Sequence, residues 1–406
     1  MQLHNDLGHL TYSTLVHPGD TWHEMKSSLM MYGPAVKKAI SPDSPFAVSL
    51  RLSAQSARLL LDDAEERAEL RSFMNDESLY LLTANAFPYG PFKGGVVKER
   101  VYEPDWTTED RVTYTLAVAE VLADLVPVEI KPSIQTAPLA FRPNVTGPDY
   151  ITTFTRNVHR VIAGLVDIER RTGRTVTLAL EPEPWCFLAT TTETVAYFEQ
   201  HLYSAAGAAA LADLAGMSLA QAHGALRRHL GVVFDICHQA VEFEDIPTSI
   251  KQYGSAGIPI FKLQEAAALW IPEVTADVVK ELVRYSDTIY LTQTTQLRDG
   301  ELRQFLNIQD AVAAWRADPN PCEWRTHFHV PVFLEDLGPF RTTRFAIEDA
   351  LRVHADAPVS DHLEIETYTW DVLPDHLKNA DITTYVTREL EWVEQTLMGV
   401  TKEARS

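Results

Sequence analysis

The sequence predicts a (β/α)8 barrel of the TIM type, in which eight parallel strands close on themselves and helices cover the outside. The chain of 406 residues suits one large barrel with insertions. Short aliphatic or β-branched runs alternate with longer amphipathic stretches, a pattern typical of a parallel sheet covered by helices. Several late runs end in carboxylate or amide side chains, and barrels carry their functional groups at the C-terminal ends of the strands.

Ten segments have the length and composition of buried strands. They are residues 10–16, 46–52, 79–86, 126–134, 175–181, 231–236, 258–264, 288–292, 326–333 and 363–368. A barrel requires eight. The turn residues Arg298, Asp299 and Gly300 separate two strand-like runs and predict an inserted β-hairpin over residues 288–305, which accounts for one surplus segment. For the other, we consider that one of the first four segments lies outside the barrel.

Helical patterns follow these strands along most of the chain. They cover residues 108–125, 149–172, 191–215, 276–285 and 385–399. The alanine-rich segment 205–215, with the helix that follows it to residue 229, indicates extra helices rather than a linker. Because no repeat, Pro/Ser-rich stretch or break in composition divides the chain, we expect a single domain over residues 1–406.

The composition limits the partners and the compartment. The 35 basic and 56 acidic residues give a net charge of −21, which argues against nucleic acid as a partner. The amino terminus lacks the basic and apolar regions of a signal peptide, and no window reaches the roughly 18 apolar residues of a membrane span. Three scattered cysteines argue against a disulfide framework. We therefore expect a cytoplasmic protein without membrane insertion, in an oligomeric state that the sequence leaves open.

Polar side chains end four of the late strand segments. They are Glu181 and Glu183, Asp235, Lys262 and Gln264, and Glu364 and Glu366. Both faces of a barrel strand are covered, so a charge there is costly unless it is paired or bound to a cation. Carboxylate and amide oxygens that meet at one barrel mouth suit a hard divalent ion. We therefore predict one divalent metal ion, with Mn²⁺ or Mg²⁺ favoured and Zn²⁺ or Co²⁺ compatible.

Residue spacing alone does not decide which member of several side-chain pairs lies in the site. The pairs are Glu181 and Glu183, Lys262 and Gln264, His327 and His329, and Glu364 and Glu366. Side chains two apart on a strand point the same way and differ in depth by roughly 6–7 Å. His327 and His329 can be zinc ligands or hydrogen-bonded core histidines, and His329 is the better candidate because it lies nearer the end of its strand.

Several stretches spread over nearly the whole chain resemble one group of proteins. They are residues 17–22, 85–92, 101–106, 181–184, 235–238, 327–331 and 364–370. In these residues the chain resembles the xylose-isomerase-like barrel superfamily, which includes sugar epimerases, hydroxypyruvate isomerases and endonuclease IV. Within that superfamily it is most similar to the EboE family of metabolite-traffic proteins. The stretches are specific together, whereas each one alone is a weak signal.

The resemblance implies a set of metal ligands. Members of the epimerase and hydroxypyruvate isomerase branch hold their metal with a Glu, an Asp, a His or Gln, and a final Glu. Carried over to this chain, the ligands are Glu181, Asp235, Gln264 and Glu366. The same resemblance favours Glu181 and Glu366 over the neighbouring glutamates that spacing alone left as alternatives.

The resemblance also implies residues that contact the substrate. His238 follows Asp235 by three residues, the position at which related enzymes grip a substrate oxygen. His329 is a further substrate or metal contact, and Lys262 is expected to face the same cavity. The family pattern favours His at the position of Lys93, so Lys93 receives no role.

These features lead to one hypothesis of function and two alternatives. We expect a metal-dependent isomerase or epimerase that acts on a sugar or cyclitol-like metabolite through an enediolate, in an ebo-type pathway of metabolite processing or export. Glu181 and Glu366 would remove and return the proton. One alternative is a barrel that binds and delivers a metabolite without turning it over. The other is a phosphodiesterase of the endonuclease IV type, which the charge of −21 disfavours.

Overall fold

The computed structural model describes residues 1–93, 95–282, 285, 289–369 and 380–403. Eight strands form one parallel sheet. They are β1 (His9–Tyr12), β2 (Phe46–Arg51), β3 (Leu79–Asn85), β4 (Ser133–Thr136), β5 (Thr177–Leu180), β6 (Leu230–Asp235), β7 (Ile260–Glu265) and β13 (His362–Ile365). The sheet has the order β1-β13-β7-β6-β5-β4-β3-β2, so the strands follow one another as they do along the chain, with an insertion between β7 and β13.

The two end strands of this order, β1 and β2, close the sheet into a barrel. A parallel bridge joins Ser13 and Ser49, and the Thr11 hydroxyl donates a hydrogen bond to the Ala47 carbonyl oxygen at 2.7 Å. Every residue of β2 is buried, as expected for a strand that is covered on both faces. The prediction of a TIM-type barrel is confirmed.

One of the two surplus strand segments is not the one that the sequence suggested, whereas the predicted hairpin region lies outside the barrel as expected. The first four predicted segments all contribute barrel strands, so the expectation that one of them lies outside is wrong. Segment 326–333 lies outside instead and contains most of β11 (Glu323–Val330). Segment 288–292 forms no strand over residues 289–292, and residue 288 lies outside the described residues. Composition cannot separate these cases, because buried strands of either sheet type have similar apolar runs.

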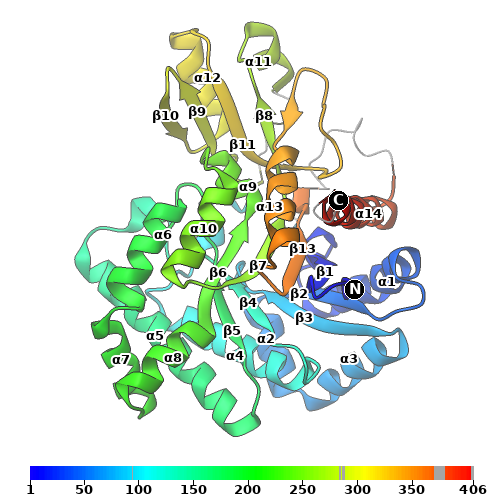
Figure 1. The fold of residues 1–406 in the computed structure, drawn as a ribbon, viewed down its shortest axis with the longest axis vertical. Coiled ribbons are helices and arrows are strands. Elements are labelled where there is room, and N and C mark those ends of the chain that lie inside the picture. Colours follow the sequence, from blue (N-terminus) through cyan, green and yellow to red (C-terminus); the bar gives the residue numbers. More distant parts are fainter. Residues whose placement is uncertain (94, 283–284, 286–288, 370–379, 404–406) are drawn as a thin grey trace.

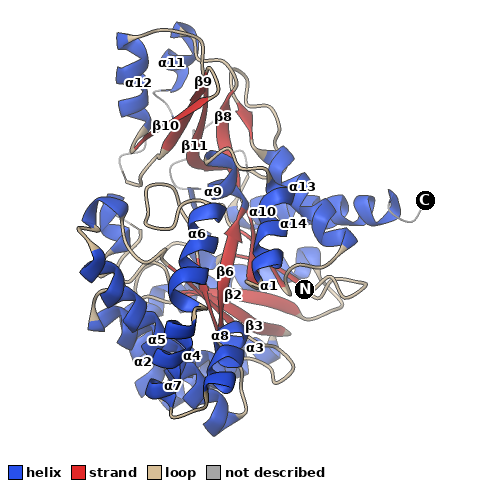
Figure 2. Ribbon diagram, turned by 60° about the vertical axis from the view of Figure 1, so that its left-hand side comes forward, coloured by secondary structure: helices blue, strands red, loops and turns tan. Residues whose placement is uncertain are grey.

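An antiparallel sheet forms the insertion and projects from one end of the barrel (Figures 1 and 2). It contains β8 (Ala267–Ile271), β9 (Thr294–Arg298), β10 (Glu301–Phe305), β11 and β12 (Arg341–Thr342), in the order β10-β9-β11-β8-β12. Helices α11 (Ala276–Leu282) and α12 (Ile308–Ala317) accompany it. The predicted hairpin is confirmed as β9–β10, and its turn holds Asp299 and Gly300 at φ values of 52° and 81°, the left-handed conformation of tight hairpin turns. We call this insertion the lobe.

Helices surround the barrel (Figure 2). They are α1 (Trp22–Ile40), α2 (Ala54–Asp62), α3 (Ala64–Asp76), α4 (Glu109–Leu125), α5 (Pro148–Thr172), α6 (Thr191–Tyr197), α7 (Ala205–Ala215), α8 (Leu219–His229), α9 (Ile236–Val241), α10 (Ile246–Ala256), α13 (Arg344–Asp356) and α14 (Ile382–Glu403). Short 3-10 turns span Thr14–Val16, Lys98–Tyr102 and Arg142–Asn144. Thr21 and Glu24 form a reciprocal capping box at the start of α1, which satisfies free amides of the first turn.

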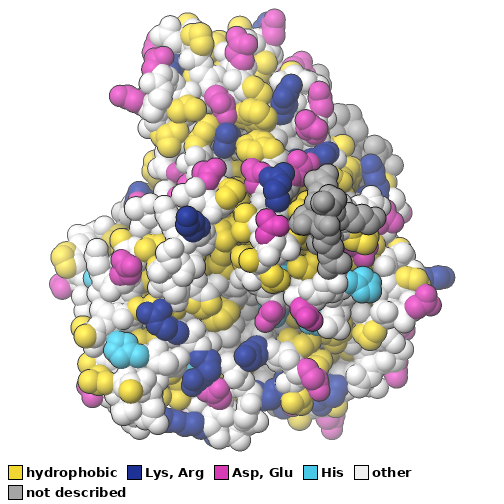
Figure 3. Space-filling model, viewed as in Figure 1, with side chains coloured by type: hydrophobic (Ala, Val, Ile, Leu, Met, Phe, Trp, Pro, Cys, Tyr) yellow, Lys and Arg dark blue, Asp and Glu magenta, His cyan; other side chains and the backbone are white. Residues whose placement is uncertain are grey.

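The predicted helix over residues 191–215 is divided. A π-helical turn, Phe198–Leu202, separates α6 from α7, and α8 follows as the extra helix that the alanine-rich segment indicated. Over the described residues, no helix combines the length and apolar composition needed to cross a membrane. On the face seen in Figure 3, Asp and Glu side chains are spread over barrel and lobe and interspersed with Lys and Arg.

Candidate metal and substrate site

Three carboxylates meet at the C-terminal end of the barrel. Glu181 follows β5, Asp235 ends β6 and Glu366 follows β13, and each offers an oxygen within 4.8 Å of the other two. The strand register explains the meeting, because Asp235 pairs with Gln264 of β7 and the Glu366 amide donates to the Glu265 carbonyl. All three carboxylates are buried, so the cluster is shielded from bulk water.

The side-chain amide of Gln264 lies among these carboxylates. Its Nε2 is 3.0 Å from Glu181 Oε1, 2.6 Å from Asp235 Oδ2 and 2.9 Å from Glu366 Oε2. An amide nitrogen carries only two hydrogens, so it cannot donate to all three oxygens. Among the described residues, the buried Gln264 Oε1 has no hydrogen-bond partner. Heavy-atom positions do not distinguish the nitrogen of a side-chain amide from its oxygen. If the two change places, Oε1 faces the three carboxylate oxygens, and four oxygens form the oxygen-rich set that a divalent cation prefers.

The electrostatics of the cluster also fit a cation. Burial, with the nearby charges of Glu366 and Asp235, raises the pKa of Glu181 well above its usual range. Burial, with the charges of Glu364 and Asp235, raises the pKa of Glu366 to about 8. A bound divalent ion would favour the ionised form of both groups. The four residues therefore suit a hard divalent ion such as Mg²⁺ or Mn²⁺.

A layer of amides and an amine lies against the carboxylates. Asn85 donates to Glu366 Oε1 at 3.1 Å, and Gln135 donates to Glu181 Oε2 at 2.8 Å. The Lys262 amine in turn donates to Gln135 Oε1 at 2.7 Å and to Glu364 at 2.8 Å. Lys262 is fully buried and paired, so a substrate contact through its amine would require it to give up one of these partners.

Sequence reasoning missed Asn85 and Gln135, although the signal was present. Asn85 ends β3 and Gln135 lies one residue before the end of β4. Both are polar residues at C-terminal strand ends, the same feature that drew attention to the later strands. Their strands carry no carboxylate at that point, so the amides lacked the charge that made the other positions conspicuous.

Glu183 lies in a separate group of contacts from Glu181. It accepts hydrogen bonds from the Tyr102 hydroxyl at 2.7 Å and from Gln293 Nε2 at 3.0 Å, and its Oε1 is 3.6 Å from His327 Nδ1. Gln293 precedes β9 in the lobe, so Glu183 joins the barrel to the insertion. The structure thus brings Glu181, and not Glu183, together with Asp235 and Glu366.

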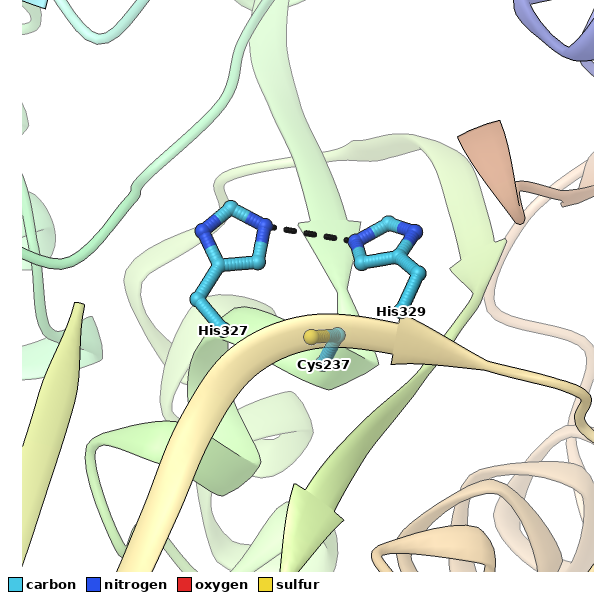
Figure 4. Close-up of side chains that lie close together, drawn as sticks. All are labelled: Cys237, His327 and His329. Carbon is cyan, nitrogen blue, oxygen red and sulfur yellow. Dashed lines mark hydrogen bonds between the residues drawn. The ribbon is translucent and has the colours of Figure 1, made fainter. Parts of the chain in front are cut away.

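Three histidine rings lie beside the carboxylates. His238 comes from α9, whereas His327 and His329 come from β11 of the lobe. The Nε2 atoms of His238 and His327 are 3.3 Å apart, and those of His327 and His329 are also 3.3 Å apart. Figure 4 shows the rings of His327 and His329 turned toward each other, with the Cys237 thiol nearby. Burial lowers the pKa of His327 well below its usual value and that of His329 to about 4.

A cavity opens above the carboxylates. It contains about 520 Å³ of space not filled by protein atoms, with the open solvent at its mouth included. Its polar residues include Glu181, Glu366 and His238, and its walls include the aromatic rings of Phe87 and Tyr368. The arrangement combines a charged floor with apolar walls.

Comparisons with known proteins add the following findings. No protein-family model matches the chain, and no curated protein matches its sequence. Among solved structures, the chain is similar to an IolI protein with a bound zinc atom, at 13% identity over 97% of this chain and 98% of that chain with a TM-score of 0.45. It is similar to a xylose isomerase-like TIM barrel protein from Mycobacterium smegmatis in complex with magnesium, at 10% identity over 96% and 100% of the two chains with a TM-score of 0.47. It is also similar to D-psicose 3-epimerase from Clostridium cellulolyticum H10, solved with D-tagatose, at 11% identity over 97% and 99% with a TM-score of 0.48.

Proposed function

We propose that the protein is a metal-dependent isomerase or epimerase of the xylose-isomerase-like kind, acting on a small polyhydroxylated metabolite such as a sugar or cyclitol. One observation carries the proposal. Three buried carboxylates at the ends of three strands lie within 4.8 Å of one another, and two of them, Glu181 and Glu366, line a cavity. They surround an amide whose oxygen has no hydrogen-bond partner among the described residues. Glu181, Asp235, Gln264 and Glu366 are the proposed ligands of the ion.

The proposed chemistry is transfer of a proton between adjacent carbons through an enediolate. When bound, the ion would supply positive charge against the oxygens on which negative charge develops. Glu181 and Glu366 stand just past the ends of β5 and β13, with β6 and β7 between these strands, so they can flank a substrate on the cavity floor. Their carboxylates would remove the proton and return it. Burial raises the pKa of both carboxyls, which is the direction that general acid–base catalysis near neutral pH requires.

The remaining residues would bind and orient the substrate. The rings of Phe87 and Tyr368 offer flat apolar surface to one face of a sugar ring. His238 and His329 are candidates for contacts to substrate oxygens, and Lys262 remains a predicted contact of the same kind. Participation in an ebo-type pathway is part of this proposal and is supported by the sequence stretches that resemble the EboE family.

Deuterium exchange tests the proposal directly. Purified protein loaded with Mn²⁺ is incubated in D₂O with a panel of ketohexoses and cyclitols, and loss of substrate C–H signal is followed by proton NMR. We expect exchange with at least one compound, and we expect Glu366→Gln to slow it by about 100-fold or more. Glu265→Gln is the matched control. Glu265 is a buried glutamate on the face of β7 opposite to Gln264, and burial holds its pKa well above the usual range.

The outcomes separate an enzyme from a carrier. If a compound binds in calorimetry but shows no exchange and no product, the protein is a binding barrel and the catalytic proposal is wrong. If the protein binds neither metal nor any compound of the panel, the site itself is wrongly assigned.

A further inference from the structure

We propose that His238, His327 and His329 form a second metal site, selective for a zinc-type ion, beside the carboxylate site. It uses different ligand chemistry from the carboxylate site and does not rest on the proposed function. It also gives His238 and His329 another role than the substrate contact implied by the family resemblance. The nitrogen that carries the hydrogen in each ring decides whether the three rings can bind an ion.

Two of the rings have their tautomer fixed by backbone carbonyls. His238 Nδ1 lies 2.8 Å from the Pro182 carbonyl oxygen, and His329 Nδ1 lies 2.7 Å from the Glu366 carbonyl oxygen. A carbonyl oxygen only accepts hydrogen bonds, so Nδ1 carries the hydrogen in both rings. In the neutral form, each Nε2 is then an unprotonated nitrogen with a free lone pair.

The third ring is fixed by a side-chain amide. His327 Nδ1 lies 3.1 Å from Gln293 Oε1. Gln293 is itself oriented, because its Nε2 donates to Glu183 at 3.0 Å and lies 3.0 Å from the Tyr102 hydroxyl. His327 Nδ1 therefore donates to Gln293 Oε1, and the Nε2 of His327 is also bare.

Unprotonated nitrogens that lie this close together repel each other unless a positive charge lies between them. His327 Nε2 is 3.3 Å from Nε2 of both His238 and His329, and two lone pairs that face each other at this distance repel. The Tyr368 hydroxyl, 3.4 Å from His327 Nε2, can donate one hydrogen bond there but cannot satisfy both contacts. Ligands at about 2.0–2.1 Å from a tetrahedral zinc ion stand about 3.3–3.4 Å apart, and both contacts of His327 Nε2 have this spacing.

The surroundings have the features of a built metal site. Ligand histidines usually donate their second N–H to a carbonyl or another acceptor, which fixes the ring, and all three rings do so here. Imidazole nitrogen favours Zn²⁺ and similar ions over Mg²⁺ and Ca²⁺. All three side chains are buried, and His238 and His327 line the cavity, so a bound ion would have access to ligands from that side.

Asp235 provides the fourth ligand and joins the two sites. Its Oδ1 accepts the backbone N–H of His238, and its Oδ2 is 3.6 Å from His238 Nε2. Asp235, His238 and His329 offer ligand atoms within 4.8 Å of one another, as Asp235, Glu181 and Glu366 do. The geometry therefore points to a pair of neighbouring ions that share one carboxylate, with three imidazoles on one side and oxygens on the other.

Metal content and cobalt spectroscopy test this site. Purified protein stripped with a chelator is titrated with Co²⁺, whose visible absorption is strong in tetrahedral nitrogen sites, and bound ions are counted by elemental analysis. We expect about two ions per chain and a tetrahedral spectrum. His327→Gln should lose that spectrum and one ion. Glu366→Gln should lose the other ion and keep the spectrum, so failure of the carboxylate site and failure of this site are distinguishable.

The matched control is His354→Gln, because His354 is a fully buried histidine of α13 that bonds to a backbone carbonyl and lies outside the site. It should bind Co²⁺ like the wild type. X-ray absorption at the cobalt edge of the unmodified protein, which shows imidazole nitrogens around the ion, gives a second measurement if His327→Gln does not fold. The proposal is overturned if that spectrum shows no imidazole ligands, or if a folded His327→Gln protein binds cobalt like the wild type. A proton shared between the rings would then explain their close contact.

Discussion

Lys262 Nζ and Glu364 Oε2 form an ion pair of 2.8 Å inside the barrel, and neither side chain has exposed surface. The pair lies two residues before Gln264 and Glu366 on their strands, which is one layer deeper than the carboxylate site. Because Lys262 also holds Gln135, this ion pair connects the interior of the barrel to the orientation of Glu181.

Removing one partner of this pair should be more harmful than removing both. Lys262→Met leaves a buried, uncompensated Glu364, and we expect a loss of about 3–5 kcal/mol in the free energy of unfolding. Lys262→Met combined with Glu364→Gln should recover much of that loss. Urea denaturation followed by circular dichroism measures both. Equal losses in the single and double variants would show that the pair is not what stabilises this layer.

Gln264 should control the affinity for the oxygen-ligated ion. Gln264→Leu removes the amide oxygen and should weaken Mg²⁺ binding by about 100-fold. Gln264→Glu adds a fourth carboxylate, so it should lower the melting temperature in chelator. The same variant should show a larger rise in melting temperature than the wild type when Mg²⁺ is added. Mg²⁺ is the appropriate probe, because it avoids imidazole ligands. Melting curves with chelator and with excess Mg²⁺ are the measurement. Identical Mg²⁺-dependent shifts in wild type and Gln264→Leu would exclude Gln264 as a ligand.

The barrel could be predicted from the sequence because most of its strands are short apolar runs followed by a helix, a local and repeated pattern. The lobe could not be predicted beyond its hairpin, because it depends on pairing between distant segments. In β11, Trp324 pairs with Ile271 of β8 and with Gln296 of β9, and no local pattern specifies such partners.

Part of the candidate site was predictable and part was not. Strand-end carboxylates were recognisable because an ionised group is exceptional in a covered strand. The contact between His238 and His327 was not, because His238 follows β6 whereas His327 lies on β11, within the register shift between Thr326 and His329. The two histidines meet because the lobe brings β11 back to the end of β6, and the spacing of residues along the chain does not indicate this.

Glu242 should make the stability of the protein depend on pH. Burial raises its pKa to about 7, and Gln304 of the lobe donates to both of its oxygens. Since the folded pKa lies above the unfolded value of 4.5, its contribution to stability is fully present below about pH 4.5 and is lost as the pH rises through about 7. Glu242→Gln should therefore gain up to about 3 kcal/mol relative to wild type between pH 5 and pH 8.

The control for this prediction is Glu301→Gln, an exposed glutamate of the same lobe. Its difference from wild type should stay constant between pH 5 and pH 8. Urea denaturation at several pH values measures both variants. A pH-independent difference for Glu242→Gln would mean that the carboxyl keeps its solution pKa in the folded protein.

Gln135 should act on the carboxylate site as a positioning residue. It donates to Glu181 Oε2 at 2.8 Å and accepts from Lys262 at 2.7 Å, so Gln135→Leu frees Glu181 to rotate and removes one partner of the buried amine. Loss of such an outer hydrogen bond typically weakens metal binding by about 10–100-fold, and we expect a change of that size in the Mn²⁺ dissociation constant measured by calorimetry. Gln296→Leu, a buried amide of β9 that accepts from Trp324, should bind Mn²⁺ like the wild type. A structural effect would lower the melting temperature in chelator without changing Mn²⁺ affinity, whereas a positioning role requires the dissociation constant itself to rise.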